Sequence, residues 1–166
     1  MNTPTPGSVR DWSPFVVTED LKHAPPPRKI DTPEGIADRL RAAAFAEIQA
    51  REAFLWAIKT FADVPANLRM AWQMLVQAED KHLHWLLARM KELGIEVSER
   101  PVSLKLWDSF MKTKTAEEFA WYMATAEERG RRAGERFYEA LKNVDPTSAE
   151  IFRKIAEEEV EHIELA

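Results

Sequence analysis

The chain has 166 residues, of which 45% are hydrophobic and 31% charged, and its formal net charge is −5. It contains no cysteine, which excludes disulfides, thiolate metal sites and iron–sulfur clusters, so any metal must be held by Glu, Asp and His. There is no secretory signal pattern, no apolar run long enough to span a membrane and no long basic block, so we expect a cytoplasmic protein without membrane or nucleic-acid partners.

Residues 1–33 are predicted to form a proline-rich N-terminal arm. The segment holds seven of the ten prolines, which excludes a continuous helix or a central strand. It also contains apolar residues that do not suit a solvated tail, namely Trp12, Phe15, Val16 and Val17. We therefore expect part of the arm to pack on the helices or on a second copy in a homodimer; disorder of the arm is the alternative.

Residues 34–166 are predicted to be one all-α domain, which opens with a helical hairpin. A first helix is expected from Pro33, with Thr32 before it, to about Ala62, and a second from after Pro65 to Leu93. Apolar residues recur at steps of three and four, as one helix face requires. The two inward stripes are Ile36, Leu40, Ala43, Glu47, Ala50, Phe54, Ala57 and Phe61, and then Leu68, Trp72, Leu75, Glu79, His82 and Leu86.

A long connection over residues 94–114, with a short helix over 104–111, precedes a second hairpin. Its first helix begins near Thr115, which can form a capping box with Glu118, and its second follows Pro146. Two short turns around one long connection favour a ferritin-like antiparallel four-helix bundle with a crossover between helices two and three. The stripes of this hairpin are Phe119, Met123, Glu127, Gly130, Gly134, Phe137 and Leu141, and then Ile151, Ile155, Glu159 and His162.

Six residues inside these apolar stripes are candidate metal ligands, and we call them the acid–histidine cluster: Glu47, Glu79, His82, Glu127, Glu159 and His162. An isolated ionised carboxylate in such a stripe is strongly disfavoured, so four acids at one height require a cation. Each Glu-x-x-His step also places its acid and imidazole on the same helix face.

The spacing of the acids supports one shared site. Glu47 and Glu79 are 32 residues apart, as are Glu127 and Glu159, and both predicted turns lie at the midpoints. Each residue of the first set is 80 positions before its counterpart in the second. The chain therefore resembles two hairpins related by an approximate two-fold axis, each supplying one Glu and one Glu-x-x-His.

Several neighbours of the cluster are weaker candidates. Those that point off the stripes are expected in solvent: Glu52, His84, Glu128 and Glu158. Arg51 and Arg131 either neutralise ligand carboxylates or are ordinary surface residues. Aromatic residues that could relay electrons are expected instead to pack in the core: Trp56, Trp72, Trp85, Trp121 and Tyr122.

The ligand pattern resembles that of ferritin-like di-iron carboxylate proteins. The phrases EIQAREAFLWAIKTFADVP, LVQAEDKHLHWL and EERG also resemble an uncharacterised bacterial family of ferritin-like proteins, over about residues 34–166. The resemblance implies that Glu47 and Glu127 are single-Glu ligands, that the Glu-x-x-His pairs supply the rest, and that Glu79 and Glu159 bridge the metals.

Oxygen and imidazole ligands suit two Fe ions, with Mn or a mixed Fe/Mn pair as alternatives, and such a pair can activate O2 or peroxide. We therefore expect a di-metal oxidoreductase, in first place a hydroxylase or oxidase of a small organic substrate served by an external electron donor. Room for that substrate is expected beside Ala43, Ala50, Gly130 and Gly134. The alternatives are a ferroxidase or iron-handling protein, a rubrerythrin-like peroxide-reducing protein, and a non-catalytic helical module with a structural metal.

Overall fold

The computed structural model describes residues 11–19 and 23–165, and this part of the chain is all-helical, with five α-helices and no β-strand. The all-α prediction is therefore confirmed. None of these helices is both long and apolar enough to cross a membrane. The helices, with one short 3₁₀ turn, are α1 (Pro33–Thr60), α2 (Ala66–Glu92), η2 (Val97–Glu99), α3 (Lys105–Met111), α4 (Ala116–Leu141) and α5 (Pro146–Leu165).

The ends of the long helices are set by local sequence signals. Thr32 precedes α1, and its Oγ1 accepts a hydrogen bond of 3.0 Å from the backbone N–H of Gly35. Thr115 caps α4 in the same way, by accepting from the N–H of Glu118 at 3.1 Å. Gly94 ends α2 with φ +69°, a left-handed conformation that glycine adopts without steric cost.

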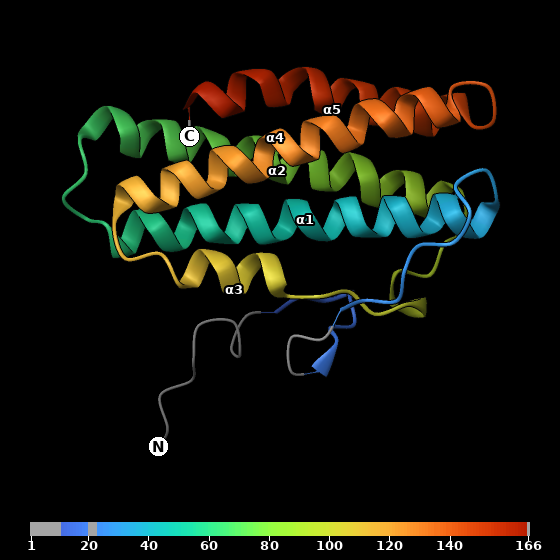
Figure 1. The fold of residues 1–166 in the computed structure, drawn as a ribbon, viewed down its shortest axis with the longest axis horizontal. Coiled ribbons are helices and arrows are strands. Elements are labelled where there is room, and N and C mark those ends of the chain that lie inside the picture. The colour runs from blue at the N-terminus through green and yellow to red at the C-terminus, as the bar shows by residue number, and fades with distance from the viewer. Residues whose placement is uncertain (1–10, 20–22, 166) are drawn as a thin grey trace.

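The long helices pack in two hairpins, α1 with α2 and α4 with α5. The hairpins meet where α2 contacts α5 and α1 contacts α4. Figure 1 shows that α1 and α5 run in one direction and α2 and α4 in the other. The segment between α2 and α4 therefore carries the chain back along the length of the molecule.

Helix α1 is buried on two faces, where the sequence predicted a single inward stripe. Phe45 and Ile48 lie outside that stripe and are 2% and 4% exposed, while Ala43, within it, is only half-buried. The second face is covered by α3, which lies beneath α1 on the side away from α5 (Figure 1). This cover comes from distant segments, so the periodicity of α1 alone could not reveal it.

Described parts of the predicted arm lie against α1 and α3. Trp12 and Phe15 are buried, with ring centroids 5.7 Å and 4.9 Å from that of Phe45, and Trp12 also meets Trp107 at 5.5 Å. Val17 forms an isolated bridge with Val102 of the crossover. Residues 1–10 and 20–22 of the predicted arm lie outside the described residues.

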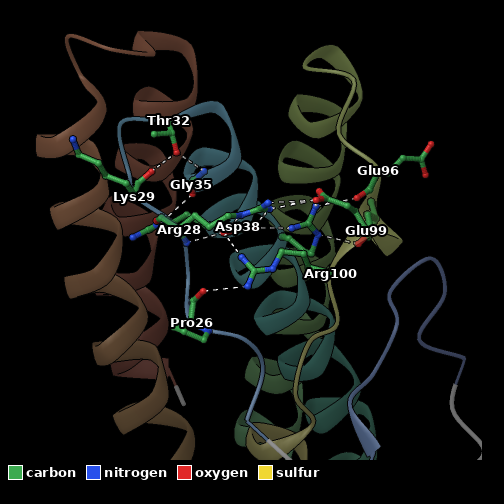
Figure 2. Close-up of polar contacts among 12 residues, drawn as sticks. Pro26, Arg28, Lys29, Thr32, Gly35, Asp38, Glu96, Glu99 and Arg100 are labelled. Carbon is green, nitrogen blue, oxygen red and sulfur yellow. Dashed lines mark hydrogen bonds and ion pairs between the residues drawn. The ribbon is translucent and has the colours of Figure 1, made fainter.

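A polar network around the buried carboxylate of Asp38 joins the arm, α1 and the crossover (Figure 2). The carboxylate of Asp38 is paired with Arg28 at 2.8 Å, with Arg41 at 3.2 Å and with Arg100 at 2.7 Å. Burial alone would raise the pKa of Asp38, but hydrogen bonds from Arg28 lower it to about 2. We call Arg28, Asp38, Arg41 and Arg100 the Asp38 network.

Candidate metal centre

All six members of the acid–histidine cluster come together in the interior. Helix α1 supplies Glu47, α4 supplies Glu127, and α2 and α5 each supply one Glu-x-x-His pair. Each of the six residues is at most 7% exposed. The matched heights predicted from the spacing of 32 residues account for this convergence, because each acid lies level with its partner across the hairpin.

The cluster contains two overlapping groups of four residues, and in each group the candidate ligand atoms lie within 4.8 Å of one another; His82, Glu159 and His162 form a third group of three. Each group of four contains one single-Glu residue and one histidine, and both share Glu79 and Glu159. The two groups of four are Glu47, Glu79, His82 and Glu159, and Glu79, Glu127, Glu159 and His162. This sharing is the arrangement that the resemblance implied for two bridging acids.

Both histidines turn Nδ1 toward the carboxylates. Nδ1 of His82 lies 3.6 Å from Oε2 of Glu47 and 3.9 Å from Oε1 of Glu159. Nδ1 of His162 lies 3.4 Å from Oε1 of Glu79 and 4.0 Å from Oε2 of Glu159. The two imidazole rings stack with their centroids 5.4 Å apart. One nitrogen of each ring therefore faces the same small space as the carboxylate oxygens.

The cluster contains buried polar atoms that the protein does not satisfy. Within the described residues no Lys or Arg forms an ion pair with any of the four acids, and every member has at least one buried side-chain atom without a hydrogen-bond partner. These atoms include Glu47 Oε2, Glu79 Oε1, His82 Nδ1, Glu127 Oε1, Glu159 Oε2 and His162 Nδ1. Such groups are rare in native interiors, so they point to a missing partner.

Burial shifts the pKa of these groups toward their neutral forms. Desolvation raises the pKa of Glu47 to about 8, with the charges of Glu159 and Glu158 adding to the effect, and raises that of Glu159 to about 8. The pKa of Glu79 is also raised, by burial and then by the charge of Glu47. Desolvation lowers the pKa of His162 to about 4, so this imidazole is neutral at pH 7, as a metal ligand must be.

The residues present fit two divalent ions. Their donors are carboxylate oxygens and neutral imidazoles, which suit Fe(II) and Mn(II). Two ions of charge +2 would offset four ionised carboxylates, and the unsatisfied oxygen and Nδ1 atoms would gain partners. A single closed tetrahedral site would leave ligands unused.

A cavity of about 60 Å³ adjoins the carboxylates of the cluster. Small residues of α1 and α4 line it, together with larger side chains of α3 and α4. The lining residues outside the cluster are Ala46, Ala50, Leu106, Phe110, Met123, Ala126 and Gly130. Of the four small residues expected to leave room for a substrate, Ala50 and Gly130 line this cavity, whereas Ala43 and Gly134 do not.

Glu158 belongs to the surroundings of the site, although the sequence suggested plain solvent exposure. Its Oε2 lies 3.3 Å from Nε2 of His82, the nitrogen that faces away from the acids, and its Oε1 pairs with Lys81. A carboxylate at the second nitrogen of a ligating histidine fixes the orientation of the ring. The contact between Glu158 and His82 depends on α5 packing against α2. In the sequence, only the position of Glu158 next to Glu159 indicated that it could lie near the site.

Other neighbours of the cluster have partners elsewhere. Arg51 pairs with Asp80 at 2.5 Å and Arg131 with Glu128 at 2.6 Å, so both arginines bind acids outside the cluster. Trp121 is 69% exposed, which makes the expected core packing wrong for this residue. Trp121 is two residues from both Phe119 and Met123, so the helical period puts it on the face of α4 opposite the buried stripe.

The chain matches a family described as "Protein of unknown function (DUF455)" over residues 4–165. The chain belongs to this family. No curated protein and no solved structure matches it. Membership of DUF455 confirms the expected likeness to an uncharacterised family, and the description of the family names no activity, so a functional argument must rest on the site itself.

Proposed function

We propose that this DUF455 protein is a di-metal carboxylate oxidoreductase that binds two iron ions in the acid–histidine cluster and reduces O2 or peroxide. The observation that carries the proposal is the pair of four-residue groups that share Glu79 and Glu159. A structural metal needs one closed site, whereas two adjacent groups with shared acids suit two cooperating ions.

The arrangement of the helices supports a ferritin-like four-helix bundle as the setting of this site. Two antiparallel hairpins, a long crossover, and one Glu or one Glu-x-x-His from each long helix form the combination known from bundles of this class. We propose the relationship on this architecture and ligand pattern together.

The protein's own residues would hold the ions and protect them. The four acids and the two Nδ1 atoms are the donors, and Glu158 orients His82. Two bound Fe(II) ions would supply the two electrons that, with two protons, convert hydrogen peroxide into two water molecules. An external donor would return the electrons.

The test is the reaction of protein loaded with Fe(II) in the absence of air. On addition of O2 or hydrogen peroxide we expect two irons per chain to be oxidised, faster than Fe(II) free in the same buffer, with a new visible or near-ultraviolet absorption. Oxidation no faster than that of free Fe(II), or uptake of one redox-silent ion, would reject the proposal.

A further inference from the structure

We propose that α3 is the wall that sets the size of molecules reaching the metal chamber, and that Leu106 and Phe110 restrict it to oxidants of a few atoms. The chamber is the cavity of about 60 Å³ beside the cluster. This inference rests on the proposed function and names its substrate class: O2 or peroxide enters, while an aromatic or larger organic substrate does not. It differs from the hydroxylase or oxidase of a small organic substrate that we expected first from the sequence.

The volume of the chamber limits the size of the molecule that it can hold. A cavity of about 150 Å³ is known to accept benzene, and sites for larger organic ligands begin at about 300 Å³. The chamber is well below both values, and the ions would occupy part of it. Room remains for a molecule of a few atoms beside the carboxylates, not for a substrate ring.

The wall contributed by α3 is firmly packed. Phe110 is fully buried, and its ring meets that of Phe119 at 5.7 Å and that of Tyr122 at 5.8 Å, so two residues of α4 fix it in place. Leu106 lies one turn earlier on the same helix and lines the same cavity. Enlarging the chamber on the side of α3 would require these side chains, or α3 itself, to move.

Helix α3 is tied directly to the helix that bears Glu47. The backbone N–H of Trp107 donates a buried hydrogen bond of 3.0 Å to Oε1 of Gln49, two residues beyond that ligand. On its other side Trp107 packs against Trp12 of the arm. The arm thus supports α3 from outside, which gives this segment a role in closing the site.

The opposite wall contains Gly130, an exposed glycine of α4 that also lines the cavity. A Cβ added at Gly130 would meet nothing within 4 Å, whereas one added at Gly134 would lie 3.2 Å from the carbonyl oxygen of Phe152. Gly134 therefore serves close helix packing, whereas Gly130 is an exposed residue that lines the edge of the cavity with no atom against its Cβ position. A methyl group at Gly130 should narrow the chamber without disturbing the helix.

The experiment measures ligand binding to air-oxidised, iron-loaded protein, with azide as a three-atom probe and benzoate as an aromatic one. Azide binding is followed by visible absorption and benzoate by its competition with azide. The variants are Leu106→Ala, which opens the wall, and Gly130→Ala, which narrows the chamber. Leu104→Ala is the matched control, since Leu104 is also half-buried at the start of α3 but does not line the cavity.

Wild-type protein and Leu104→Ala should bind azide and resist benzoate. In Leu106→Ala the apparent Kd of benzoate should fall at least tenfold, and in Gly130→Ala the Kd of azide should rise several-fold with the iron content unchanged. Benzoate competing equally well in wild type and Leu106→Ala, or azide binding unaffected by Gly130→Ala, overturns the inference alone. Absence of iron uptake in every form overturns the proposed function and the inference with it.

Discussion

Helix α1 carries two buried groups of charges that are treated in opposite ways. In the Asp38 network one carboxylate meets three guanidinium groups, and Arg41, 2% exposed, also donates to the carbonyls of Glu96 and Val97 at 2.9 Å each. Less than three turns further along α1, Glu47 joins three other acids with no described cation among them. The chain compensates the first group itself, whereas no described Lys or Arg pairs with the acids of the second group, which we propose to bind metal.

Under the proposed function, this difference separates charges that stabilise the fold from acids that bind metal. A buried ion pair is tolerated when each charge has partners of good geometry, and losing one partner is costly. A buried acid without a partner instead takes up a proton or binds a cation. Removing the charge of one acid should therefore destabilise the protein in the Asp38 network and stabilise the metal-free protein in the acid–histidine cluster.

The largest expected effect is on metal content. Glu79→Ala or Glu159→Ala should abolish binding of both ions, because each acid belongs to both four-residue groups. Asp38→Asn should keep both ions, and so should Asp80→Ala, which removes an acid of α2 that pairs with Arg51 outside the cluster. Elemental analysis of protein purified without chelator measures this, and two ions retained in either Glu variant would show that the ligand set is wrong.

The second expected effect is on stability and differs in sign between the groups. Asp38→Asn should lower the free energy of unfolding by about 3 kcal/mol, since it removes the charge that three guanidinium groups share and leaves buried Arg41 with only the longer ion pair to Glu99 at 3.4 Å. Glu79→Gln should raise that of the metal-free protein at pH 8 by about 1 kcal/mol, because the amide mimics the protonated acid that burial favours. Urea unfolding of both variants measures these two changes in the free energy of unfolding. A loss of stability in both variants would contradict the predicted difference in sign.

A smaller effect is expected in the pH dependence of the metal-free protein. Between pH 6.5 and 8 the folded state keeps protons on Glu47 and Glu159, whose pKa values are about 8, while the unfolded chain, with a Glu pKa near 4.5, has released them. Stability must then fall as pH rises, by about 1 kcal/mol per pH unit or more. The window begins at 6.5 because below it His162, with its pKa lowered to about 4, acts in the opposite sense.

The ions should remove this slope, since they take the place of the protons. Unfolding curves at several pH values, recorded with chelator and with added metal, provide the comparison. An equal slope in both series would mean that the acids of the cluster are not metal ligands.

The parts of the molecule that the sequence could predict are those set by local periodicity and spacing. The N-terminal ends of α1 and α4 follow from Thr32 and Thr115. The convergence of the acid–histidine cluster follows from acids placed symmetrically about two short turns. These features depend on one helix or one hairpin, so the pattern of the chain contains them.

Features that depend on segments distant in the sequence were missed. The Asp38 network needs Arg100, 62 residues away, and the contact of Glu158 with His82 needs α5 to pack on α2. The chamber was expected to be roomier because its small residues were visible, whereas Leu106 and Phe110 fill it from the crossover. Helical period alone does not show which face a distant segment will cover.

The most direct test of the account is an anaerobic titration of chelator-treated wild-type protein with Fe(II). The two groups that share Glu79 and Glu159 predict saturation at two ions per chain. Saturation at a single ion, or no binding at all, would contradict the central claim that the unsatisfied acids of the cluster form a two-metal site.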